Sequence, residues 1–337
     1  GIINLLTARA VTLFNGGHLR DRKPLGLRLG SLLDFDTFEE LLSAYQKQLA
    51  YYFRALARQE QMEYDFCAQE GAFLYISMLM DDCIERNRSV CGGGVRYLGG
   101  TLETYGNINT ANSLYAIRDL VYERKLISRE TLMKALEANF AGYEMERRLL
   151  LDAQKYGNDL DGVDQLAAQL HEYVCETVRE MRTETKLHSY LVVIINNEAN
   201  TVLGRFTWAS ADGRLAGEPM ANANNPAGGT DSSGVTAMLN SLVKLRTDIH
   251  AGAVQNMTFS RDFFRDGRGP VRAVLDTYFQ NGGPQAMINV LSRGELEEAI
   301  REPERHQNLM VRVGGFSARF ETLSPDVQRE IASRTLY

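Results

Sequence analysis

Short apolar runs of strand length alternate along this chain with long helical stretches, and this alternation limits the possible folds more than any other feature. The expected strands lie near residues 72–79, 190–202, 254–259 and 286–291. The first of these runs has no polar alternation, which is typical of a strand buried on both faces of a parallel sheet. Strands separated by helices indicate about five parallel βαβ units. The sequence therefore predicts an α/β fold.

Helix-start and helix-stop signals support this order of elements. Residues 3–14 are expected to form a helix that ends at Asn15-Gly16-Gly17 in a left-handed turn. Thr37 and Glu40 form a capping-box pattern, which predicts a long amphipathic helix to about Gln61. Residues 129–184 are expected to be mainly helical.

Composition excludes several classes of protein. The chain has 337 residues and a net charge of −6, without a dense basic cluster, which argues against a nucleic-acid surface. No apolar run reaches the length that spans a bilayer, so we expect no membrane association and a cytoplasmic location. The four cysteines lack metal-ligand spacing, and neither a zinc site nor a disulfide framework is indicated.

A β-prone run from Val311 to Phe320 contains the pair Gly314-Gly315. Such a pair within a strand often marks a bulge, a tight turn or a close backbone approach. The Arg-Val-x-Gly-Phe pattern here is followed by a Ser-Pro-Asp helix start and by Ser333-Arg334-Thr335. In this order the three motifs resemble the radical-bearing loop of glycyl radical enzymes.

Further motifs resemble the dehydratase branch of that family. They are Asp81-Asp82-Cys83-Ile84-Glu85-Arg86, a Gly-Gly-x-x-Tyr turn at residues 93–97, and a Ser-Leu-x-Ala-Ile helix that starts at Ser113. The turn at 211–219 and the Gly-rich loop at 225–234 also resemble family segments. The resemblance implies the C-terminal half of a roughly ten-stranded β/α barrel. We expect a half-barrel over residues 1–210 and a glycyl radical domain over 211–337.

The resemblance also implies a role for each residue of the loop. Gly315 is expected to store the radical, because an α-carbon without a Cβ can flatten and be packed closely. Gly314 gives the loop room, and Val313 and Phe316 are expected to shield it from solvent, with Arg312 in support. The resemblance implies no bound cofactor, because a separate radical S-adenosylmethionine activase installs the radical.

The Gly-Cys-x-Glu loop that supplies the thiyl radical in this family is absent from the sequence. We expect the chain to be a fragment, a cleaved product or one subunit of a split enzyme, completed by an N-terminal half or a partner that carries this cysteine. Cys91 is a poor substitute, because no glutamate follows it at the required position. The complete enzyme is expected to be an anaerobic homodimer.

Candidate substrate-binding residues lie on the expected strand 190–202 and after the first helix. Dehydratase members carry a tyrosine near the position of Ile195, and Asn197 or Glu198 is expected to face the barrel instead. His18 is a further candidate. The expected activity is that of a lyase, either a dehydratase or a decarboxylase. An acyltransferase similar to pyruvate formate-lyase, and a non-catalytic or spare-part subunit that supplies the glycine loop, remain alternatives.

Overall fold

The computed structural model describes residues 1–19, 21–195, 198–264 and 268–337. Its centre is a parallel sheet with the strand order β1-β2-β3-β4. The strands are β1 (Ile2–Asn4), β2 (Gly99–Tyr105), β3 (Ser189–Ile194) and β4 (Gly252–Ala253). Because each strand pairs with the next one in the sequence, the sheet advances in one direction, as expected for part of a β/α barrel.

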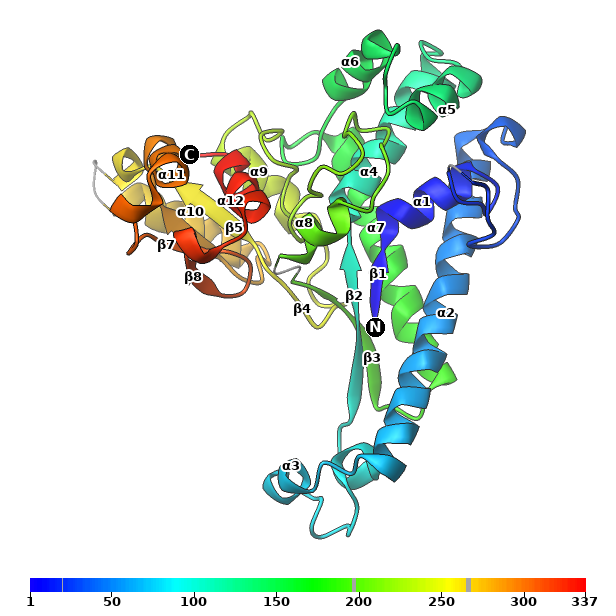
Figure 1. Ribbon diagram of the computed structural model, residues 1–337, viewed down its shortest axis with the longest axis vertical. Coiled ribbons are helices and arrows are strands. Elements are labelled where there is room, and N and C mark those ends of the chain that lie inside the picture. The colour runs from blue at the N-terminus through cyan, green and yellow to red at the C-terminus, as the bar shows by residue number, and fades with distance from the viewer. Residues whose placement is uncertain (20, 196–197, 265–267) are drawn as a thin grey trace.

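Two long helices, α2 (Phe38–Glu70) and α7 (Asp161–Glu180), run alongside this sheet (Figure 1). Two more, α1 (Leu5–Leu13) and α4 (Asn107–Ile117), continue beyond the ends of β1 and β2 and pack with these long helices. The residues facing them form one apolar core that joins the sheet to the helices. In β3 these residues are Tyr190, Val192 and Ile194, all fully buried. The helical layer is therefore fixed to the sheet by alternate side chains of its strands.

The other face of the sheet is only partly covered within this chain. Leu191 and Val193 alternate with the buried side chains of β3 and are half-buried. The strands were expected to be buried on both faces, and this is wrong for the chain by itself. No element among the described ranges packs fully over this side, which corresponds to the interior of a barrel.

The remaining elements follow β3 or lie at one end of the sheet. Helices α5 (Arg129–Glu137) and α6 (Glu144–Asp152) precede α7, and α8 (Ala199–Gly204) and α9 (Val235–Val243) follow β3. A smaller C-terminal unit then contains a parallel pair of strands and an antiparallel hairpin. Its elements are β5 (Asn256–Phe259), α10 (Gly269–Gln280), β6 (Met287–Val290), α11 (Arg293–Arg301), β7 (Met310–Arg312), β8 (Ser317–Arg319) and α12 (Pro325–Ser333).

The run 72–79 does not form the buried strand that its sequence predicts. Residues Leu74–Leu79 form the short helix α3, which Phe73 enters with a left-handed φ of 41°. The helix lies at the far end of α2, away from most of the molecule (Figure 1). Leu74 is 71% exposed and Tyr75 is 72% exposed. An apolar run fixes neither helix nor strand when it is this short, because its periodicity cannot be read.

Several expected boundaries are confirmed, and others shift. Asn15 and Gly16 have φ values of 52° and 75°, so the first helix ends in the left-handed turn that was predicted. The helix itself begins only at Leu5, because residues 2–4 form β1. The Thr37–Glu40 capping box is present, but α2 continues nine residues beyond Gln61 to Glu70. None of the described helices is long and apolar enough to cross a membrane.

Two histidines in this fold predict loss of stability in acid. The rings of His171 and His250 lie 5.4 Å apart, and burial beside His171 lowers the pKa of His250 from 6.5 to about 4. The unfolded chain therefore binds more protons than the folded chain in this interval. We expect the urea midpoint to fall as the pH drops from about 6.5 towards about 4, and to fall less in His250→Gln.

The control is His188→Gln, because His188 lies exposed on the surface. Its urea midpoint should follow that of the unmodified chain across the same pH range. An equal acid-induced fall in His250→Gln and His188→Gln would contradict the role assigned to His250.

Candidate functional site

The Gly314-Gly315 pair forms the turn of the β7–β8 hairpin. The N–H of Val313 donates to the carbonyl of Phe316 at 2.9 Å and closes the turn. Gly315 has a φ of 86°, a conformation that side chains with a Cβ rarely adopt. Its N–H faces the sulfur of Met287 on β6 at 3.0 Å. The turn therefore requires glycine at position 315 for its backbone conformation alone.

Polar side chains from two elements hold the first strand of this hairpin. Asn289 on β6 accepts from the N–H of Arg312 at 2.7 Å and donates to the carbonyl of the same residue at 3.2 Å. Arg334, directly after α12, donates to the carbonyls of Arg312 at 3.2 Å and Val313 at 2.8 Å. The backbone just before the two glycines is thus bound from both sides.

The shielding expected of the loop is present on one side only. Val313 is 1% exposed and Gly314 is buried, because this side of the hairpin packs on β6 and α12. Gly315 is exposed, and Phe316 is 39% exposed. Phe316 does not cover Gly315 within this chain, and its shielding role stays a prediction. The side chain of Arg312 is exposed and donates to the hydroxyl of Ser317 at 2.8 Å.

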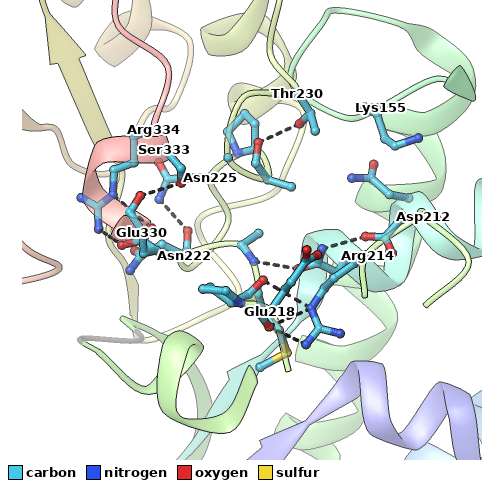
Figure 2. Close-up of a pocket in the computed structure, with 18 of the residues that line it drawn as sticks. Lys155, Asp212, Arg214, Glu218, Asn222, Asn225, Thr230, Glu330, Ser333 and Arg334 are labelled. Atoms are coloured by element: carbon cyan, nitrogen blue, oxygen red, sulfur yellow. Dashed lines mark hydrogen bonds and ion pairs between the residues drawn. The ribbon is translucent and has the colours of Figure 1, made fainter. Parts of the chain in front are cut away.

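A pocket of about 800 Å³ lies beside α12 (Figure 2). Three separated motifs that resemble glycyl radical enzymes line it, namely the turn at 211–219, the loop at 225–234 and the C-terminal Ser333-Arg334-Thr335. Helix α4 and the segment around Lys155 supply the opposite wall. Arg334 therefore contacts the glycine hairpin and also lines the pocket.

Asp212 is the buried acidic group on the α4 side of the pocket. It accepts from the amide of Asn109 at 2.7 Å and from the hydroxyl of Ser210. The fully buried Arg9 lies within its electrostatic range, and burial lowers the pKa of Arg9 to about 10. The charge of Asp212 opposes this shift and favours the charged form of Arg9.

Two buried cations close the same end of the pocket. Arg214 donates to the carbonyls of Gly204 at 3.0 Å and Trp208 at 2.7 Å. Lys155 donates to the carbonyls of Leu150 at 2.6 Å and Ala153 at 2.9 Å. Burial lowers the pKa of both side chains. Because their donors are engaged by backbone carbonyls, both residues shape the wall.

The C-terminal tail is anchored at the other end of the pocket. The hydroxyls of Thr335 and Tyr337 both donate to the carboxylate of Asp231. Burial raises the pKa of Asp231, while these two hydrogen bonds oppose the shift. The backbone of Tyr337 donates to the carbonyl of Thr258 at 2.9 Å and accepts from Ser260 at 2.6 Å. The tail thus continues alongside β5 as a short parallel bridge.

Some polar atoms of the pocket wall have no protein partner among the described residues. They are Asn112 Nδ2, Thr201 Oγ1 and Asn256 Oδ1. Buried polar atoms of this kind are normally satisfied by water or by a ligand. No cluster of metal-ligating side chains lies among the residues that the structure describes.

The described substrate candidates Ile195, Glu198 and His18 do not line this pocket. Ile195 follows the end of β3 and is half-buried, while Asn197 lies outside the described residues. Glu198 lies just before α8 rather than in a buried strand, so the expected strand over 190–202 is wrong from Glu198 onwards. His18 packs edge-on against Trp208 and pairs with Asp21.

Sequence reasoning did not assign roles to Asp212, Asn225, Asp231 or Arg334. Each of these residues belongs to a motif that resembles a segment of the family. That resemblance was the only sequence signal that could have indicated a role for them. Cys91 lies in a short helical turn at residues 90–94, near the end of α2, and burial raises its pKa. A thiol with a raised pKa is less reactive. This agrees with the expectation that Cys91 is a poor substitute for the cysteine of the missing Gly-Cys-x-Glu loop.

Two family models match the chain. One, described as pyruvate formate lyase-like, matches residues 1–204, and the other, described as glycine radical, matches residues 220–321. Trans-4-hydroxy-L-proline dehydratase of Clostridioides difficile is 30% identical over 99% of this chain and 43% of its own length. The probable dehydratase YbiW of Escherichia coli is 32% identical over 90% of this chain and 39% of its own length.

Solved structures agree with these matches. Hydroxyproline dehydratase from Clostridioides difficile superposes with a TM-score of 0.95 at 30% identity, over all of this chain and 43% of that chain. The glycerol dehydratase from Clostridium butyricum gives 0.94 at 28% identity, with the same coverage. The chain therefore spans less than half the length of these relatives, and their architecture identifies its sheet as a partial barrel. This chain belongs to the pyruvate formate lyase-like family of glycyl radical proteins.

Proposed function

We propose that this chain is the radical-storing part of a glycyl radical lyase and that Gly315 carries the radical. The observation that carries this proposal is the position of Gly315, a left-handed glycine at the turn of a hairpin bound by β6 and α12. Loss of the α-hydrogen leaves an electron shared by the adjacent nitrogen and carbonyl. This sharing requires the α-carbon to become planar, and a Cβ would hinder that change.

The proposed reaction begins when a radical S-adenosylmethionine activase removes the α-hydrogen of Gly315 as an atom. The glycyl radical then takes a hydrogen atom from the thiol of a cysteine on the completing polypeptide, which restores glycine and leaves a thiyl radical. The thiyl radical takes hydrogen from a C–H bond of the substrate, and the substrate radical expels its leaving group. Return of hydrogen from the thiol to the product radical leaves a thiyl radical again. That thiyl radical takes back an α-hydrogen from Gly315, which restores the glycyl radical and closes the cycle.

Substrate binding is proposed at the half-buried face of the sheet, where Ile195 follows β3. The relatives include a dehydratase for a hydroxylated imino acid, sulfite-lyases for isethionate and a decarboxylase for indoleacetate. These names share cleavage of a carbon–heteroatom or carbon–carbon bond in a small organic acid or alcohol. We propose a small substrate of this kind, with His18 and Glu198 as more distant candidates.

We also propose that residues 1–210 and 211–337 act as two functional units. The first supplies the half-barrel, and the second supplies the glycine hairpin and most of the pocket. Completion of the barrel, dimer formation and a cytoplasmic, anaerobic setting belong to the same proposal. The correspondence of this chain to 43% of its relatives supports completion of the barrel, and the other three rest on the family resemblance alone.

A second candidate function is a spare-part subunit that supplies the glycine hairpin to a damaged or separate partner. The exposed outer side of Gly315 and Phe316 favours it, because an exposed hairpin is available for insertion into another polypeptide. The sequence also lacks the Gly-Cys-x-Glu string. Both candidates assign the same role to Gly315 and differ in the identity of the partner.

Electron paramagnetic resonance tests the assignment of Gly315. After anaerobic co-expression with the radical S-adenosylmethionine activase of the source cell, we expect a doublet from the remaining α-hydrogen of Gly315. Labelling with α-deuterated glycine should collapse the doublet, and Gly315→Ala should abolish it. Gly294→Ala is the matched control, because a Cβ at Gly294 meets no atom within 4 Å. A doublet that persists in Gly315→Ala places the radical elsewhere.

Turnover tests the need for a completing polypeptide. The activated chain alone should convert neither trans-4-hydroxy-L-proline, glycerol nor isethionate, because it has no Gly-Cys-x-Glu string for the thiyl step. Addition of a polypeptide that carries this string should start product formation, measured by mass spectrometry. Product formation by the chain alone would show that one of its own groups replaces the missing cysteine.

A further inference from the structure

We propose that Arg334 is a positioning residue that, together with Asn289, clamps the backbone before Gly314-Gly315 and thereby sets the conformation of the radical loop. This inference rests on the proposed function for its purpose, because it assigns regulation of the same loop. The clamp itself is argued only from contacts within this chain, on the two sides of the loop.

The guanidinium of Arg334 binds two consecutive carbonyls of the loop and a carboxylate of its own helix. Nη1 donates to the carbonyl of Arg312 at 3.2 Å, and Nη2 donates to the carbonyl of Val313 at 2.8 Å. Nε and Nη2 also donate to Glu330 at 3.2 and 2.8 Å. Only a planar group with several fixed donors can serve these acceptors together, so lysine is not an equivalent residue here.

Burial makes this clamp stronger than an ordinary surface ion pair. The side chains of Arg334 and Glu330 are only 11% and 10% exposed. Charged hydrogen bonds in such surroundings are weakly screened, and removal of one partner leaves the other charge without compensation. By contrast, Arg272 and Asp276 on α10 form an i,i+4 pair with side chains that are 83% and 57% exposed. That pair contacts no part of the hairpin.

Asn289 completes the clamp from the opposite element. Its side chain donates to the same Arg312 carbonyl that Arg334 binds, and it also accepts from the Arg312 N–H. Asn289 is 5% exposed on β6, and Arg334 follows α12, so the loop is tied to two separate elements. Release of the loop therefore requires the contacts of both Asn289 and Arg334 to break.

The clamp also links the loop to the C-terminal tail. Arg334 is followed directly by Thr335, whose hydroxyl donates to Asp231, and the tail ends beside β5. The tail therefore restrains Arg334 from its C-terminal side, while Glu330 restrains it from within α12. A loop that must be reached by an activase and then return to a fixed place needs an anchor of this kind.

Hydrogen–deuterium exchange of the full chain tests the clamp without any need for enzyme activity. In Arg334→Gln we expect exchange in the peptide covering residues 311–318 to rise about tenfold. Exchange in residues 325–332 of α12 should rise much less than in the loop, because Glu330 alone in that helix loses its Arg334 partner. Arg334→Lys should fall close to Arg334→Gln, and Asn289→Ala should produce a rise of similar size. Arg272→Gln is the matched control and should leave the loop unchanged.

The outcomes separate this inference from the proposed function. Unchanged loop exchange in both Arg334→Gln and Asn289→Ala would overturn the clamp. A uniform rise across α12 and the loop would also overturn it, since that result indicates a general structural role. If Arg334→Gln fails to fold, Asn289→Ala carries the same measurement, because it removes the other half of the clamp. The exchange experiment can confirm the clamp even if no radical signal is found at Gly315. In that case the missing signal contradicts the proposed function, and the clamp remains supported.

Discussion

One-sided burial of the parallel sheet is the constraint on which the rest of the structure depends. Tyr190, Val192 and Ile194 are fully buried beneath the helical layer, and α7 packs along β3. A parallel sheet normally buries both faces, and only one is fully covered by the residues described here. Because the buried face fixes the positions of the strands, it also determines where their C-terminal ends and the following loops meet.

Those loops bring distant parts of the sequence to one pocket. The turn at 211–219, the loop at 225–234 and the tail after α12 are separated along the chain, yet they line the same cavity. Hydrogen bonds from Arg214 and Lys155 to backbone carbonyls hold the wall. The hairpin of Gly315 is placed by its attachment to β6 and α12, so its position depends on the same packing.

The fold could be predicted from the sequence where local signals were strong. Capping boxes at Thr37 and Ser292 begin α2 and α11, and the family motifs indicated a half-barrel. Prediction failed at residues 72–79, where a short apolar run formed a helix, and from Glu198 onwards, where the chain turns into α8. Periodicity in such short segments does not distinguish helix from strand.

The candidate site was predictable only in part, for a related reason. Gly315 stood out because its motif is local, and glycine alone accommodates its backbone. The contacts of Arg334 and Asp231 join residues that are far apart in sequence, and no local pattern specifies them. The solvent exposure of Phe316 also depends on what covers the hairpin, which the sequence of this chain does not describe.

The arm formed by the end of α2 and by α3 affects how the purified chain behaves in solution. Phe66, Leu74, Tyr75, Met78 and Leu79 are all at least 60% exposed. Contiguous apolar surface of this kind adheres to other molecules and promotes aggregation. Work with the purified chain at high concentration will therefore call for a solubilising fusion or a mild detergent. The yield of soluble protein will depend more on aggregation through this arm than on the stability of the core.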